Sequence, residues 1–281
     1  MFNIIINNTH VANSLNNMYQ YNFKNGSFEV PENSEIMITS MQIPYSWYNI
    51  TTRYNNNSFK IYWPTVTAGY TAFTVTIPDG FYSTPSINAY VQQFCIQNKL
   101  YIVDSTGNNV YYISLAYNTT YYANQLITKV VPTSLPVGHS TPSGFAGFPT
   151  VARTPYIEIL ANNGFGKILG FTSGNYGINK TANYSTNSNI IPKGSIVNSL
   201  VVKCSLVNNG VSNQSDILDA FAISGGSFGE NLNFNNSIEK WVSLNSGRYS
   251  NFTITILDEN FNDINILDNN ILINFLIRVK K

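Results

Sequence analysis

The most conspicuous shortage in this sequence is charge. Only 10% of its 281 residues are Asp, Glu, Lys or Arg, and the formal net charge is +1. A typical soluble domain carries about 25% charged residues. A surface with so little charge offers no attraction for nucleic acid or anionic lipid, and little repulsion between copies of the chain. We therefore expect no nucleic-acid specificity and a chain that packs readily into assemblies.

Histidine is also scarce, which limits the catalytic and metal sites that the chain could build. The two histidines, His10 and His139, lie far apart in the sequence. A Ser-His-acid site would need one of them, but Pro142 stands where a G-x-S-x-G motif around His139 needs its last glycine. A metal site of the cupin type needs several clustered histidines. We predict no catalytic, cofactor-binding or metal-binding residue, and we interpret His139 as a surface-loop residue.

Three further segments match ligand-binding loops only in part. Residues 164–167 read Gly-Phe-Gly-Lys, but Ile168 stands where a phosphate-binding loop needs Ser or Thr. Residues 224–229 are rich in glycine but lack the lysine that should follow. Residues 258–263 begin like a calcium loop but lack the glycine and glutamate of an EF-hand. We interpret all three as turns; paired carboxylates for glycoside cleavage stay open, because the sequence does not show which acids meet.

Cysteine is rare, and long apolar runs are absent. Cys95 and Cys204 each fall on an apolar stripe far from the other, so we predict two buried free thiols, a usage typical of a reducing compartment. No stretch approaches 18 apolar residues, so no membrane span is predicted. Residues 1–7 have neither a basic region nor a long apolar run, so we expect no signal peptide.

What the sequence has in abundance is strand-forming residues that alternate with polar ones. Alternation over 19–23 and 28–30 flanks Asn25-Gly26, the strongest short signal for a hairpin. Alternation over 252–256 and 271–279 flanks a turn at 258–262 and predicts a second hairpin.

One further strand defines a candidate buried face. Residues 200–206 place their even-numbered side chains on one side, which we expect to be buried, and direct Lys203 to water. The buried set comprises Leu200, Val202, Cys204 and Leu206.

One short amphipathic helix interrupts the strands. Its apolar residues recur with helical spacing between Ile87 and Cys95, and Thr84 followed by Pro85 is typical of a helix start. We expect this helix to cover part of a sheet.

The remaining stretches suggest how the chain is organised. Residues 117–195 are less regular, with five prolines between 132 and 155, and we expect a loop-rich insertion there. Residues 1–18 are polar and irregular, and we expect an N-terminal arm. The sequence therefore predicts an all-β sandwich over 19–281 as a single domain.

Two aromatic clusters allow two interpretations. Tyr45 with Trp47, and Tyr62 with Trp63, could form sugar-stacking platforms. They could equally lie in the core or at a subunit interface, where tyrosine and tryptophan concentrate. Both readings stay open at this point.

Several segments together resemble the penton, or vertex capsid, proteins of virophages and related polinton-like double-stranded DNA viruses. Their order and spacing over about 240 residues carry the resemblance more than any one of them. The segments are 43–50, 55–59, 75–83, 165–171, 197–204, 254–260 and the closing strand 271–279.

The resemblance implies a single jelly roll, with eight strands in two facing antiparallel sheets. It implies a structural capsid protein that forms a homopentamer at each vertex of an icosahedral virion, beside a double jelly-roll major capsid protein and minor or cement proteins. It implies no enzymatic activity and no cofactor, and a location in the virion, assembled in the cytoplasm of the infected host cell. The alternative is a jelly-roll module for carbohydrate binding or host attachment.

Overall fold

The structure is a computed structural model that describes residues 1–67 and 69–280. The chain forms two units of unequal design. The first, called here the jelly-roll unit, comprises Met1–Trp47 and Val197–Lys281; the second, the inserted unit, comprises Tyr48–Ile196. Each unit is described by itself below.

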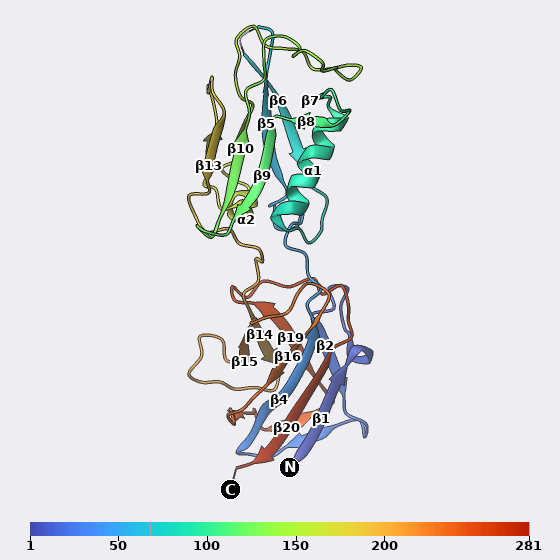
Figure 1. The fold of residues 1–281 in the computed structure, drawn as a ribbon. Coiled ribbons are helices and arrows are strands. Elements are labelled where there is room, and N and C mark those ends of the chain that lie inside the picture. Colours follow the sequence, from blue (N-terminus) through green and yellow to red (C-terminus); the bar gives the residue numbers. More distant parts are fainter. Residues whose placement is uncertain (68, 281) are drawn as a thin grey trace. The chain divides into compact units, whose positions relative to one another are not determined.

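The jelly-roll unit is built from strands at the two ends of the chain (Figure 1). Its elements are β1 (Phe2–Asn7), the 3-10 turn η1 (Asn8–His10), β2 (Met18–Asn22), β3 (Phe28–Val30), β4 (Ser34–Pro44), β14 (Ser199–Cys204), β15 (Ile217–Ala222), β16 (Asn231–Asn235), β17 (Val242–Ser243), β18 (Gly247–Tyr249), β19 (Asn251–Asp258) and β20 (Leu272–Val279).

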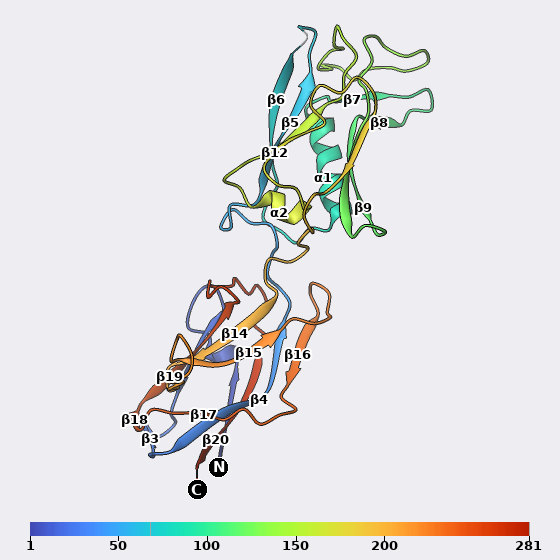
Figure 2. The ribbon, with the colours of Figure 1, turned by 90° about the vertical axis from the view of Figure 1, so that its left-hand side faces the viewer.

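Two antiparallel sheets face each other in this unit (Figure 2). One has the strand order β1-β20-β4-β16, with β17 also paired to β4, and the other has the order β15-β14-β19-β2. If the eight main strands are counted along the chain, the sheets read 1-8-3-6 and 2-7-4-5. All but one of the connections therefore cross from one sheet to the other, which is the two-Greek-key pattern of a jelly roll. The predicted fold class, a sandwich of two antiparallel sheets, is confirmed.

Alternating side chains fill the space between the sheets. Leu200, Val202 and Cys204 of β14 are buried, as are Ile254 and Ile256 of the neighbouring β19. The predicted inner face is therefore correct. Side chains two residues apart point to the same side of a strand, so the two sheets bury matching rows.

The predicted strand pairings are wrong even though the strands and turns exist. Gly26 does turn the chain, with φ of +79° and a hydrogen bond from its amide to the Phe23 carbonyl. However, β2 pairs with β19 and β3 pairs with β18. Likewise β19 and β20 lie in different sheets and form no hairpin. Alternation determines which face is buried, whereas in a jelly roll most consecutive strands belong to opposite sheets.

The expected N-terminal arm over 1–18 is instead part of the sandwich. β1 pairs along its whole length with β20, and Ile4 and Ile6 are buried. Asn17 is also buried, and its Nδ2 donates to the Ile256 carbonyl and to Asp263. Polar residues in this segment form hydrogen bonds to the rest of the unit, so polarity here does not indicate a separate arm.

The inserted unit combines three small sheets with two helices (Figures 1 and 2). Its elements are β5 (Ser58–Pro64), β6 (Tyr70–Thr76), α1 (Thr84–Gln97), β7 (Tyr101–Val103), β8 (Asn109–Tyr111), β9 (Ile113–Asn118), β10 (Ala123–Thr128), β11 (Tyr156–Ile159), α2 (Phe165–Leu169), β12 (Gly174–Tyr176) and β13 (Tyr184–Asn187). The sheets have the orders β12-β11-β5-β6, β13-β10-β9 and β7-β8.

Helix α1 closes the core of this unit, as the sequence predicted for a helix that covers a sheet. Its buried side chains, Ile87, Val91 and Cys95, belong to one cluster with Ile61 of β5 and Leu126 of β10. The helix starts one residue earlier than expected, since the Ser83 hydroxyl caps it by accepting from the Ser86 amide. None of the described helices is long and apolar enough to cross a membrane.

The inserted unit is larger and more regular than the loop-rich insertion expected over 117–195. It spans 48–196 and includes the helix that we had assigned to a single domain over 19–281. Between β10 and β11 the chain does lack helices and strands over 129–155, as the prolines indicated. Elsewhere the strands are short and polar on one side, so they resembled loops.

One asparagine fastens the start of the inserted unit to its end. The Nδ2 atom of Asn49 donates to the carbonyls of Tyr82 and Gly194 at 2.8 Å each, and its Oδ1 accepts from the Tyr82 amide at 2.8 Å. Asn49 is fully buried. Although Asn49-Ile50-Thr51 matches a glycosylation motif, this side chain is already committed to the fold.

Candidate functional site

No metal-binding cluster is found among residues 1–67 and 69–280, since nowhere do three His, Cys, Asp or Glu side chains come together. His139 lies in the irregular segment between β10 and β11, with Nδ1 3.1 Å from the Val137 carbonyl oxygen. His10 stacks on Tyr21 with ring centroids 5.4 Å apart. The two histidines are therefore engaged in different units of the fold.

The calcium-like segment at 258–263 is a turn. The Oδ1 atom of Asp258 accepts hydrogen bonds from the amides of Asn260 and Asn262, both at 2.8 Å. A carboxylate that caps two backbone amides in this way stabilises a tight turn. The glycine-rich segment at 164–167 begins the short helix α2, a difference from the expected turn.

Three of the four candidate sugar-stacking aromatics are buried. Trp47 and Tyr45 pack against each other with centroids 4.7 Å apart, and Trp63 lies in the core of the inserted unit. A buried ring cannot offer its face to a sugar, so these three serve the core.

The fourth aromatic, Tyr62, belongs to a polar cluster on the sheet of the inserted unit. Its ring stacks on Tyr156 at 4.4 Å, and its hydroxyl donates to Glu158 Oε2 at 2.6 Å. Lys60 Nζ lies 3.3 Å from the same oxygen. The hydrogen bond from Tyr62 and the nearby Lys60 charge keep the pKa of Glu158 below its usual value. Tyr62, Lys60 and Glu158 thus meet one another's hydrogen-bonding and charge requirements.

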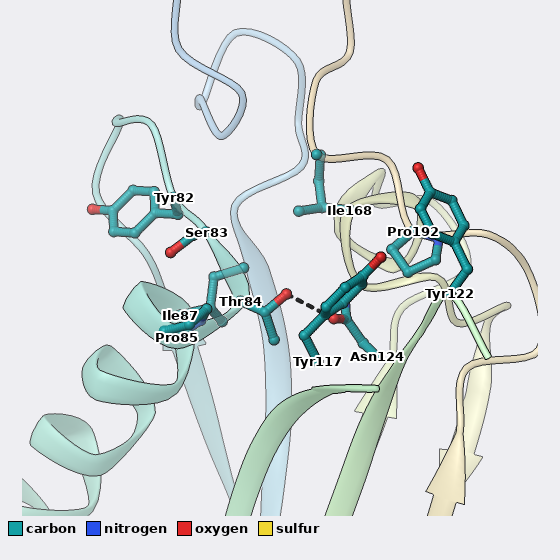
Figure 3. Close-up of a pocket in the computed structure, with 11 residues that line it drawn as sticks. Tyr82, Ser83, Thr84, Pro85, Ile87, Tyr117, Tyr122, Asn124, Ile168 and Pro192 are labelled. Carbon is teal, nitrogen blue, oxygen red and sulfur yellow. Dashed lines mark hydrogen bonds between the residues drawn. The ribbon is translucent and has the colours of Figure 1, made fainter. Parts of the chain in front are cut away.

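A cleft in the inserted unit is the strongest candidate for a binding site (Figure 3). It has a volume of about 400 Å³ and opens between the start of α1, the β9–β10 hairpin and the chain that follows α2. Its lining residues are Tyr82, Ser83, Thr84, Pro85, Ile87, Tyr117, Tyr122, Asn124, Ile168, Pro192 and Gly194. None of them carries a charge.

A hydrogen-bonded pair forms one wall of this cleft. The Thr84 hydroxyl at the first turn of α1 donates to Asn124 Oδ1 of β10 at 2.7 Å, drawn as a dashed line in Figure 3. Asn124 is buried, and its Nδ2 donates to the Leu169 carbonyl at the end of α2. Three elements are therefore tied together beside the opening, which holds the cleft in shape.

Two tyrosines of the β9–β10 hairpin form the rim on the same side of the cleft as Asn124, which pairs with Tyr117 across the hairpin. Tyr117 and Tyr122 are 44% and 64% exposed and meet edge to face, with ring centroids 6.3 Å apart and planes at 77°. Tyr82 lines the cleft too, but Figure 3 shows its ring directed away from the other residues. The aromatic surface available to a ligand is thus provided by the hairpin.

Sequence reasoning missed this cleft. Tyr117 and Tyr122 fall in the stretch read as irregular, and Thr84 was interpreted only as a helix cap. The available signal was three tyrosines within 117–122, more aromatic surface than an exposed turn needs for its own geometry.

Comparison with solved structures identifies the fold. The crystal structure of the selenomethionine-labelled mavirus penton protein matches with a TM-score of 0.51 at 8% sequence identity, covering 99% of this chain and 99% of that chain. This chain has the fold of the mavirus penton protein. A chain in the cryo-EM structure of the Sputnik virophage gives a TM-score of 0.40 at 13% identity, covering 94% of this chain and 92% of that chain. No family model and no curated protein matches the sequence.

Proposed function

We propose that this chain is a structural capsid protein that forms the pentameric vertices of an icosahedral virion. The observation that carries the proposal is a likeness in fold to a penton protein that covers 99% of both chains, so it includes the inserted unit as well as the jelly roll. The segments that resemble virophage pentons lie in both units and support the same role.

The surface chemistry also favours assembly. A ring of five copies uses two different patches of each subunit, which close after five steps. With 10% charged residues and a net charge of +1, copies of this chain repel one another little. We propose a homopentamer that meets a double jelly-roll major capsid protein and minor or cement proteins, in the virion and during assembly inside the host cell.

We further propose that the role is structural, with no catalysis and no cofactor. His10 Nδ1 lies within 3.0–3.4 Å of Asn7 and the Thr9 hydroxyl in the capping box of the η1 turn, and His139 Nδ1 lies 3.1 Å from the Val137 carbonyl oxygen, so both rings are held by local contacts. The carboxylates of Asp258 and Glu158 are held by local hydrogen bonds, as expected of structural groups.

The native mass of the purified protein tests the proposal. We expect five times the chain mass of 31.3 kDa, either alone or after mixing with the major capsid protein of the same virus. The control is the same mixture at high dilution, where a specific ring should persist longer than non-specific aggregates. A trimer, or a monomer under both conditions, would contradict the vertex role.

A further inference from the structure

We propose that the cleft between α1 and the β9–β10 hairpin binds an uncharged saccharide. The inference goes beyond the vertex role and does not depend on it, because it rests on residues of the inserted unit alone. The volume of about 400 Å³ lies within the range of about 300–1,000 Å³ that small-molecule sites occupy. A cleft of this size accepts one or two sugar rings.

The lining determines the class of ligand. No charged side chain lines the cleft, so a phosphate or carboxylate would enter without a counter-charge. Ser83, Thr84 and Asn124 bond within the protein, so the polar groups left for a ligand are the hydroxyls of Tyr117 and Tyr122, and a wholly apolar ligand packed on these rings would offer them no partner. A neutral sugar fits both conditions, because its hydroxyl groups lie around its edge and its C–H groups lie on its faces.

The rim offers what a sugar face requires. Tyr117 and Tyr122 present their rings at the opening, and their hydroxyls make no hydrogen bond to another residue within 1–67 and 69–280. An exposed tyrosine combines a flat apolar face with a polar tip, so it can pack against C–H groups and bond a hydroxyl at once.

The backbone at Tyr122 adds an independent argument. This residue has φ of +48°, a left-handed conformation that costs a bulky side chain about 1–2 kcal/mol. The ring recovers little of that cost by packing, since it is 64% exposed and the aromatic ring it meets is that of the half-exposed Tyr117. A strained, exposed tyrosine at the edge of a cleft is the arrangement expected where function retains it.

Saturation-transfer NMR on the full chain tests the proposal. The probes are glucose, galactose, N-acetylglucosamine and fucose, with N-acetylneuraminic acid and glucose 6-phosphate as charged comparators. We expect transfer to at least one neutral sugar and none to the charged pair. Tyr117→Ala and Tyr122→Ala should weaken binding by about tenfold or more, and Tyr122→Phe should keep much of it because the ring remains.

The hairpin supplies a matched control. Tyr121 is 69% exposed on the same turn but does not line the cleft, so Tyr121→Ala should bind like the parent. A second variant blocks the site from the other side. A Cβ atom placed on Gly194 meets no atom within 4 Å, so the backbone has room for a side chain there, and we expect Gly194→Trp to obstruct the cleft.

Four results would overturn the proposal. These are no transfer to any neutral sugar, binding of the charged sugars only, equal binding by Tyr122→Ala and the parent, and equal loss in Tyr121→Ala and Tyr122→Ala. Thermal melting of each variant verifies that it is folded. The native mass of Tyr122→Ala separates this proposal from the vertex role, because the cleft variant should assemble as the parent does.

Discussion

The two units close their cores in different ways. In the jelly-roll unit two sheets cover each other: β20 alternates between buried and more exposed residues, and β14 and β19 do so except over 200–202 and 256–258, where consecutive residues are buried. In the inserted unit the helix α1 packs against residues from two sheets. Each unit also buries one free cysteine, Cys204 in β14 and Cys95 in α1. Strand alternation marks the buried face in both units, since Phe59, Ile61 and Trp63 of β5 are also buried, but it does not tell whether a sheet or a helix covers that face.

The largest expected effects come from truncating one core leucine in each unit. Leu200 and Leu126 are both fully buried, in the jelly-roll and inserted units respectively. Leu200→Ala and Leu126→Ala should each lower the free energy of unfolding by about 2–5 kcal/mol. If the units unfold separately, each variant weakens its own unit alone.

The two cysteines report which unit has opened. Burial raises the pKa of Cys95 and of Cys204 to about 12, so each thiol reacts only when its surroundings open. With a thiol reagent and peptide mass spectrometry, Leu200→Ala should accelerate labelling of Cys204, and Leu126→Ala labelling of Cys95. Equal acceleration of both thiols in both variants would mean that the units unfold as one.

An intermediate effect is expected at the asparagine that fastens the inserted unit. Asn49→Ala leaves the Tyr82 amide and the carbonyls of Tyr82 and Gly194 without their partner. The loss should be about 1–3 kcal/mol, visible as faster labelling of Cys95 with Cys204 unchanged. Asn175→Ala is the control, because Asn175 lies exposed on β12 and should melt like the parent.

Lowering the pH should reduce the stability of both units, because each contains a glutamate with a lowered pKa. The hydrogen bond from Tyr62 lowers the pKa of Glu158 in the inserted unit. Burial raises the pKa of Glu259 in the jelly-roll unit, but hydrogen bonds from Asn198 and Ser199 outweigh it, so the pKa is lowered.

The sign of this pH dependence follows from linkage. A glutamate with a lowered pKa stabilises the fold above its unfolded value of about 4.5, and the contribution is lost as pH falls through the folded pKa. Melting temperatures between pH 6 and 3 should therefore fall, and Glu158→Gln or Glu259→Gln should each flatten that decline. A steeper decline in either variant would contradict the assignment.

The smallest effect is expected at Lys203. Its ammonium group lies 2.8 Å from Asp216 Oδ2 on the partly exposed side of β14. Such pairs contribute about 0.2–1 kcal/mol, so Lys203→Ala should melt within a few degrees of the parent. A loss as large as that of Leu200→Ala would show that this face of the sheet is covered by another subunit.

The sequence predicted local features better than connections. It identified the buried face of β14, the amphipathic helix and the turn at Gly26, because spacing and turn residues depend on near neighbours. It failed on the pairing of β2 and β3 and on the start of the inserted unit, which was expected at 117 and lies at Tyr48, whereas the expected end at 195 lies beside Ile196. Strand pairing over long separations depends on the whole core, and the strands and helix of 48–116 follow the same patterns as those of the other unit.

The site shows the same limit. The core role of Trp47 and Trp63 was one of two open readings, since a tryptophan suits either a core or a binding surface. The place of Tyr117 and Tyr122 at a cleft is visible only in the folded chain, where the hydrogen bond between Thr84 and Asn124 joins α1 to β10. A cleft built from three separate segments leaves no spacing pattern in the chain.

The position of the inserted unit determines the order in which the two cores can form during translation. β1 pairs with β20, so the first strand waits until nearly the whole chain has been made, roughly 10–50 s at about 5–20 residues per second. The inserted unit is continuous in sequence and can fold during that interval. The apolar strand β4 meanwhile has no sheet partner, since β16, β17 and β20 all follow later. Nascent chains therefore carry an exposed, aggregation-prone strand beside an already folded unit, and a chaperone that shields 34–44 would raise the yield of finished subunits.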